Sequence, residues 1–133
     1  METLLQTPVV EAGRISLVAT AAFMGWAVNS RVYFEYLEES KAWVLRQRDL
    51  PQFIKANRAT YSAIESFVDA KHRLSIPRVV LETLGIERQE HQAFVLAVRP
   101  KSKKRNDRVE PAVFLFSATT AAQIMIDSIN NSN

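Results

Sequence analysis

Apolar and polar residues alternate most regularly over residues 67–77. One parity is mostly apolar and the other is polar, which predicts a β-strand with one buried face. The apolar parity consists of Val68, Ala70, His72, Leu74 and Ile76, so His72 is expected to be a packed histidine. Pro77 ends the strand and suits the first turn of a helix. In that helix Val80, Leu81 and Leu84 have helical spacing, and Gly85 supplies a left-handed cap.

The rest of the second half predicts a long β-hairpin followed by a helix. The strands are expected at 93–100 and 111–116, and the polar stretch 101–108 between them contains the turn pair Asn106-Asp107. Ser117, Thr119 or Thr120 is expected to cap the helix. Its predicted core positions are Ala122, Ile124, Met125 and Ile129.

The first half predicts the same order of elements. A strand is expected at 9–17, a short helix at 19–26 that ends near Gly25, and two strands at 32–37 and 42–46 joined by a polar turn. Asp49 is expected to cap a further helix, with Pro51 in its first turn, that runs to about Ala63.

An internal repeat accounts for this common order. The sequence GRISL at 13–17 recurs as HRLSI 59 residues later, at 72–76. The chain of 133 residues is therefore interpreted as a single domain with two strand–helix–strand–strand–helix repeats, at about 9–63 and 67–129.

Composition excludes several classes of site. The absence of cysteine removes disulfides, zinc fingers, iron–sulfur clusters and thiol nucleophiles, and it fits a reducing cytoplasm. No Gly-rich phosphate loop, nucleophile elbow or metal-ligand spacing occurs, so no enzymatic activity, cofactor or metal is expected. The uncharged stretch 15–28 is shorter than the roughly twenty residues that cross a membrane, so no membrane partner is expected.

The positive charge is unevenly distributed. The formal net charge is +3, and all of the excess lies in the second half. It is concentrated in Arg99, Lys101, Lys103, Lys104, Arg105 and Arg108. Such a cluster is typical either of a solvated loop or of a phosphate-binding patch, and both interpretations stay open.

The segment DAKHRLSIPRVVLETLGI, residues 69–86, resembles the AbrB-like swapped-hairpin DNA-binding proteins, whose pattern is D-x-K-G-R-hydrophobic-x-I-P, a short helix and L-G. Two copies in one chain are similar to the MraZ family of bacterial transcriptional regulators. The first copy, aligned without a gap, departs from the pattern because Val10 stands at the Asp position and Val18 at the Pro position. In the second copy His72 replaces the usual Gly.

The resemblance implies an α+β, mainly β fold: a pseudo-twofold β-barrel in which two copies exchange hairpins. It further implies a cytoplasmic, nucleoid-associated regulator that binds double-stranded DNA and forms a homo-oligomer. Asp69 is expected to orient Arg73. The expected DNA-binding residues are Arg14, Lys71, Arg73, Arg78, Lys101, Lys103, Lys104, Arg105 and Arg108.

Two alternatives accompany this hypothesis. Arg73 and Lys71 lie on the polar parity of their strand, which is typical of a solvated face with an Arg73–Asp69 ion pair, or of contacts to phosphates and base edges. The rival function is a protein-interaction module, an antitoxin or a phage- or plasmid-type inhibitor that binds a host protein with the same barrel. The incomplete first copy favours that rival. Apolar positions in the helices at 51–63 and 119–129 also favour a subunit interface.

Overall fold

The computed structural model describes residues 1–47, 64–86, 91–101 and 111–131. These residues form an α+β fold that is mainly β, as the sequence predicted. The strands are β1 (Glu2–Gln6), β2 (Val9–Val10), β3 (Arg14–Ser16), β4 (Arg31–Leu37), β5 (Ala42–Gln47), β6 (Glu65–Phe67), β7 (Arg73–Ser75), β8 (His91–Arg99) and β9 (Ala112–Ser117). The helices are α1 (Val18–Met24), α3 (Arg78–Leu84) and α4 (Ala118–Asn131).

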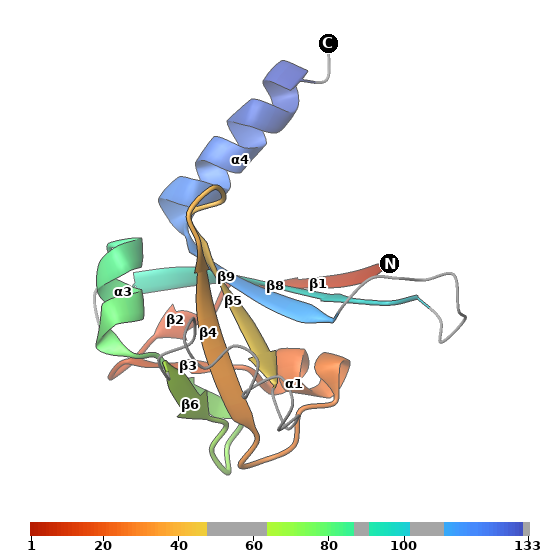
Figure 1. Ribbon diagram of the computed structural model, residues 1–133, viewed down its shortest axis with the longest axis vertical. Coiled ribbons are helices and arrows are strands. Elements are labelled where there is room, and N and C mark those ends of the chain that lie inside the picture. The colour runs from red at the N-terminus through yellow and green to blue at the C-terminus, as the bar shows by residue number, and fades with distance from the viewer. Residues whose placement is uncertain (48–63, 87–90, 102–110, 132–133) are drawn as a thin grey trace, which may run out of the picture.

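The strands form one large antiparallel sheet and one separate ribbon (Figure 1). In the sheet the order is β1-β8-β9-β5-β4-β6, with β2 also paired to β8, and the ribbon consists of β3 and β7. The path through the described strands stays open. The expected closed barrel is therefore not confirmed.

The first strand of each repeat pairs with a long strand of the other repeat. β2 lies on β8, with Val9 opposite Gln92, and β6 lies on β4, with Val32 opposite Ser66. The two repeats are thus interlocked through their hydrogen-bonded strands rather than merely packed against each other.

Equivalent strands of the two repeats also pair with each other. β3 and β7 are antiparallel and centred on Ile15 opposite Leu74, and β5 and β9 are antiparallel and centred on Val44 opposite Phe114. Each pair joins matching positions of the repeat, as a twofold axis requires. Two matching hydrogen bonds extend the ribbon: the Leu17 N–H donates to the His72 carbonyl, and the Ile76 N–H to the Gly13 carbonyl, both at 2.8 Å.

The core draws on both repeats. Ile15 and Leu74, on the inner face of the ribbon, are fully buried together with Val10 and Val68 in one cluster of apolar side chains. A fully buried aliphatic side chain contributes about 1.5–3 kcal/mol to folding. The pairing of β3 with β7 therefore buries Ile15 and Leu74 at the pseudo-twofold axis, where both contribute to the stability of the fold.

The predicted short helices are confirmed in both repeats. Each ends at a glycine in the left-handed region, Gly25 with φ 72° and Gly85 with φ 68°. At each end the residue after the glycine closes the cap: Trp26 donates its N–H to Ala21, and Ile86 donates to Leu81, both at 2.9 Å.

The predicted continuous strands at 67–77 and 9–17 are wrong. A turn interrupts each of them, and Val68 faces Leu74 across the second turn rather than following it along one strand. Both side chains point to the core because they oppose each other in a hairpin. Their even spacing along the chain also fits one strand with a buried face, which is why the alternation predicted a continuous strand. Ala70 is exposed, and His72 is a half-buried turn residue rather than a packed histidine.

The predicted core positions of the last helix are also wrong. Ser117 caps α4 by accepting a hydrogen bond from the Thr120 N–H at 3.2 Å, as expected. The helix then projects away from the sheet, touching β8 and β9 near its start (Figure 1). Ala122 is exposed, and the exposed fractions of Ile124, Met125 and Ile129 are 51%, 66% and 65%. The helix predicted at 51–63 lies outside the described residues.

The sequence did not predict β1, which adds a strand to β8 and is tied to α1. The side chain of Gln6 accepts hydrogen bonds from both the N–H and the hydroxyl of buried Thr20. These bonds satisfy polar groups that would otherwise be buried without a partner.

His72→Gly should stabilise the fold. His72 has φ 56°, a region that costs an L-residue roughly 1–2 kcal/mol, whereas glycine occupies it without that cost. After subtracting glycine's extra entropy in the unfolded chain, we expect a gain of about 0.5–1 kcal/mol in chemical denaturation. The control is Ala70→Gly. Ala70 does not have a positive φ, so this variant should lose stability. A loss in both variants would contradict the assignment.

Candidate nucleic-acid interface

The outer face of the β3–β7 ribbon carries two equivalent arginines. Arg14 lies opposite Ser75, and Ser16 lies opposite Arg73, so all four side chains share one face, while Ile15 and Leu74 occupy the other. The arginines form a diagonal pair, for which the Cα separation in an antiparallel ribbon is roughly 7–8 Å. The pseudo-twofold axis passes between them.

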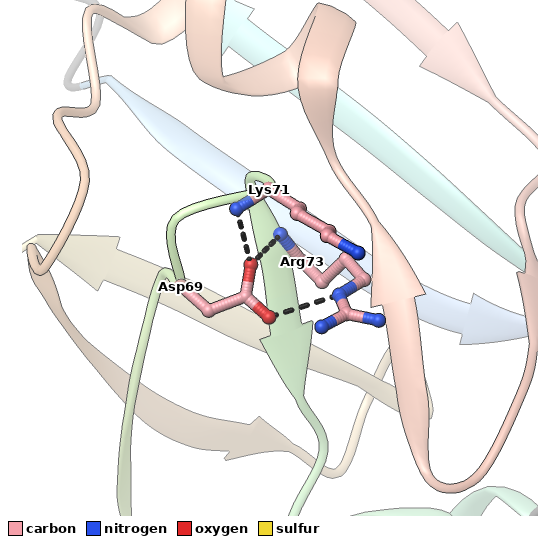
Figure 2. A network of polar contacts seen from close by, with 3 residues as sticks. All are labelled: Asp69, Lys71 and Arg73. Atoms are coloured by element: carbon pink, nitrogen blue, oxygen red, sulfur yellow. Dashed lines mark hydrogen bonds and ion pairs between the residues drawn. The ribbon is translucent and has the colours of Figure 1, made fainter.

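In the second repeat, Asp69 organises the turn that precedes β7 (Figure 2). Its Oδ1 accepts hydrogen bonds from the backbone N–H groups of Lys71 and Arg73, at 2.8 and 2.9 Å. Its Oδ2 accepts a third, from the Nε of Arg73 at 2.9 Å. One carboxylate thus fixes both the path of the backbone and the orientation of the guanidinium.

These contacts favour the ionised carboxylate. The backbone hydrogen bond from Arg73 is the largest influence that lowers the pKa of Asp69, and the Lys71 N–H and the Arg73 side chain add to it against the opposing effect of desolvation. Asp69 therefore stays charged well into the acidic range, and its orienting effect on Arg73 is present at neutral pH.

The rest of the Arg73 guanidinium makes no bond within the described part of the chain. Nε is bonded to Asp69, whereas neither Nη is bonded to any described residue, and the side chain is 36% exposed. The exposed side chain of Lys71 extends beside it in the same direction (Figure 2). The turn therefore places the two Nη groups of Arg73, both hydrogen-bond donors, next to the ammonium group of Lys71.

The first repeat builds a shorter turn. Glu11 and Arg14 exchange two backbone hydrogen bonds of 2.9 Å around the two residues Ala12 and Gly13, whose φ values are 51° and 72°. Two successive positive φ values are typical of a type I′ hairpin turn. The second repeat has three residues between Asp69 and Arg73.

This one-residue difference corrects the alignment of the two copies. Val10 is fully buried, as is Val68, so these two residues are equivalent. Glu11, not Val10, therefore takes the place of Asp69 in front of the turn. Among the described contacts the Glu11 side chain forms no ion pair with Arg14, so the first arginine lacks the orienting carboxylate.

The other predicted DNA-binding residues that the structure describes, Arg78 and Lys101, lie on other elements than the ribbon. Arg78 begins α3, is highly exposed and forms an ion pair with Glu82 at 2.9 Å. Lys101 is exposed and follows the end of β8. The four remaining predicted residues, Lys103, Lys104, Arg105 and Arg108, lie outside the described residues.

Arg99, which contributes to the basic excess of the sequence, is engaged in structural contacts. Its Nη2 pairs with the Glu2 carboxylate at 2.6 Å, its Nη1 donates to the Phe23 carbonyl at 2.7 Å, and its guanidinium lies 4.0 Å from the centroid of the Phe23 ring. Arg99 thus joins β1, α1 and β8, and its charge is used within the fold.

A second surface, which the sequence reasoning missed, is an apolar groove of about 410 Å³ between the sheet and α4. The sequence does contain a signal for this groove, because large apolar residues occur on both parities of β8 and β9. The positions that alternate with the core residues, and would face solvent in a one-sided sheet, are also aromatic or aliphatic. The groove is lined by Leu5, Ser40, Ala42, Phe94, Leu96, Phe114, Phe116, Ala121, Ile124 and Met125.

The described ranges contain neither a metal-binding cluster nor a membrane-spanning helix. No three His, Asp or Glu side chains there gather closely enough to hold a metal ion. None of the helices in those ranges has both the length and the apolar character needed to cross a membrane.

Comparison with known proteins gives no further assignment. No protein-family model matches the chain, and no curated protein is significantly similar to it. The interpretation of the site therefore depends on the residues and geometry described above.

Asp69→Asn should lower the melting temperature at pH 7. The amide oxygen can still accept the backbone N–H groups, but the amide nitrogen cannot accept from Arg73 Nε. Because the folded-state pKa of Asp69 lies below its ordinary 3.8, the stabilising effect is complete above that value and is lost as the pH falls through the folded-state pKa. The difference from the unmodified chain should therefore shrink below about pH 4.

Glu82→Gln is the matched control, because it removes a carboxylate from an exposed ion pair. Such pairs contribute little to stability, so the control should change the melting temperature little at any pH. A deficit of Asp69→Asn that stays constant from pH 3 to 7 would contradict the assigned contact.

Proposed function

We propose that this protein is a DNA-binding transcriptional regulator of the AbrB- and MraZ-like class, without enzymatic activity or a cofactor, that acts in the cytoplasm on the nucleoid. The observation that carries the proposal is the outer face of the β3–β7 ribbon. It presents Arg14 and Arg73 at equivalent positions, and Asp69 fixes the second of them.

The geometry of this face suits duplex DNA. The major groove accepts a two-stranded β-ribbon, and the guanidinium fork matches either guanine O6 and N7 or two phosphate oxygens. Arg73 is already oriented by Asp69, so less side-chain entropy is lost when it binds. Lys71, Arg78 and the basic residues at 101–108 would add phosphate contacts, which position a protein on DNA without reading its sequence.

The strand exchange supports the fold implied by the resemblance. β2 on β8 and β6 on β4 are pairings between repeats, and the pairs β3–β7 and β5–β9 both obey the pseudo-twofold. We propose that these strands belong to a swapped-hairpin barrel formed by one chain. The pseudo-twofold axis between the arginines would then point at the DNA.

We further propose that the apolar groove is covered by α4 of a second copy, which makes the protein a homo-oligomer. None of the residues that line the groove is charged, and only Ser40 is polar. The helix α4 offers a matching partner, since its only charged residue is Asp127. Figure 1 shows α4 at the top of the view and β3 in its lower half, so assembly through α4 would leave the ribbon accessible.

The groove is also the observation that favours the second candidate function, a protein-interaction module. An apolar surface of this kind is typical of a protein partner rather than of DNA. In that case Arg73 would pair with Asp69 only as a structural contact.

Arg73→Ala should weaken DNA binding more than Lys101→Ala. We expect a loss of about 1–3 kcal/mol for the preferred sequence if Arg73 reads a base edge, with relaxed sequence preference. Lys101→Ala should weaken binding to all sequences slightly and reduce the salt slope by about one unit. The measurement is titration of a selected duplex and a scrambled duplex at two salt concentrations.

Arg73→Lys sharpens this test, because it keeps the charge but removes the planar fork. It should retain the salt slope and lose the sequence preference. If neither duplex binds the unmodified protein even at low salt, DNA binding is wrong and the protein-interaction module takes its place.

Met125→Glu should dissociate the oligomer. The residue lines the groove and is exposed in the single chain, so a carboxylate there would be buried without a partner in the assembly. We expect the dissociation constant to rise about tenfold or more, measured by light scattering at micromolar concentration. Asn130→Glu adds the same charge at a polar position of α4 and should have little effect. A monomeric unmodified chain would contradict the proposed homo-oligomer.

A further inference from the structure

On the outer face of the β3–β7 ribbon, the two repeats differ in their basic side chains and in how those side chains are held. In the second repeat, a carboxylate fixes Arg73, Lys71 stands beside it, and Arg78 begins the following helix. In the first repeat, the corresponding turn offers Ala12 and Gly13, and Val18 begins the helix. At the equivalent positions of the two turns and helix starts, which the structure describes, three basic residues in the second repeat are therefore matched by Arg14 alone in the first.

The difference extends to how firmly each arginine is held. Arg73 donates its Nε to Asp69 at 2.9 Å, and the same carboxylate holds the backbone on which Arg73 stands. Arg14 is held only through its backbone, by the reciprocal bonds to Glu11, and its side chain has no ion pair or hydrogen bond among the described residues. A guanidinium that is fixed before contact discriminates between base edges, whereas a free one acts mainly as a charge.

We propose that the protein reads an asymmetric DNA site, in which the half that faces the second repeat is recognised by sequence and the half that faces the first repeat is contacted only through its phosphates. This inference rests on the proposed DNA binding. It identifies the ligand as duplex DNA with one specific half-site and a fixed polarity relative to the chain, although the fold itself is nearly twofold.

The first experiment uses the full-length chain and a pool of duplexes with a randomised 20-base-pair centre. Bound duplexes are selected and sequenced, and the sequence preference is compared between the two halves of the aligned site. We expect a preference confined to one half. Duplexes selected as palindromes would overturn the proposal.

The second experiment compares Arg14→Ala with Arg73→Ala on a selected duplex and on a scrambled one. Arg73→Ala should reduce affinity for the selected duplex about 10- to 100-fold and for the scrambled duplex much less. Arg14→Ala should reduce both affinities by the same factor and lower the salt slope by about one unit. Equal loss of sequence preference in the two variants would overturn the proposal.

A third variant tests the cause of the asymmetry. Residues 11–13 are replaced by a copy of residues 69–72, which supplies the first repeat with the longer turn, its aspartate and its lysine. We expect this protein to select sequences with a preference in both halves, provided that its circular dichroism matches the unmodified chain. A correctly folded variant whose preference stays in one half would overturn the role of the turn.

These outcomes are separate from failure of the proposed function. If the unmodified chain retains no duplex from the random pool at low salt, DNA binding itself is wrong. If it retains duplexes but shows palindromic or equal preferences, DNA binding stands and only the asymmetry is wrong.

Discussion

The pairing of β3 with β7 is the contact on which the rest of the structure depends. Ile15 and Leu74 meet at its centre and are buried, and the strands lead directly into α1 and α3. Neither ribbon strand belongs to the large sheet. Among the described residues, the partners of each are therefore the other ribbon strand and the short bridge across its own turn, Glu11–Arg14 or Val68–Leu74. The turns in front of β3 and β7 connect them to β2 and β6, which pair with strands of the opposite repeat. Loss of the β3–β7 pairing would therefore release both exchanged strands.

Much of this fold could be predicted from local signals. The capping glycines Gly25 and Gly85, and the repeat of Arg-aliphatic-Ser around Ile15 and Leu74, are short-range features that do not depend on the partner strand. The turns were missed because parity cannot distinguish a strand from a hairpin whose two arms bury residues of the same parity, as Val68 and Leu74 do. The one-residue difference between the turns was missed because a fixed offset of 59 allows no gap before Arg14.

The candidate site was predicted in its residue types more accurately than in its geometry. The motif placed Asp69 beside Arg73, and the three hydrogen bonds of the carboxylate agree with that interpretation. Net charge gave less guidance, because it cannot distinguish a guanidinium held within the fold from one presented to solvent. Arg99 and Arg73 count equally in the sequence, yet Arg99 is bonded to Glu2 and to the Phe23 carbonyl, whereas neither Nη atom of Arg73 is bonded to a described residue.

A pseudo-twofold fold constrains its inner and outer faces differently. Residues on the axis that point inward must fit their own equivalents, which restricts Ile15 and Leu74 to aliphatic side chains of similar volume. Residues that point outward have no such partner, so one repeat can carry a carboxylate-fixed arginine and a lysine while the other keeps a two-residue turn with little effect on the core. The backbone bonds from Leu17 to His72 and from Ile76 to Gly13 illustrate this, since both are 2.8 Å long although one turn is a residue shorter. Symmetry in the core is therefore compatible with asymmetry at the surface, as the two turns of the ribbon show.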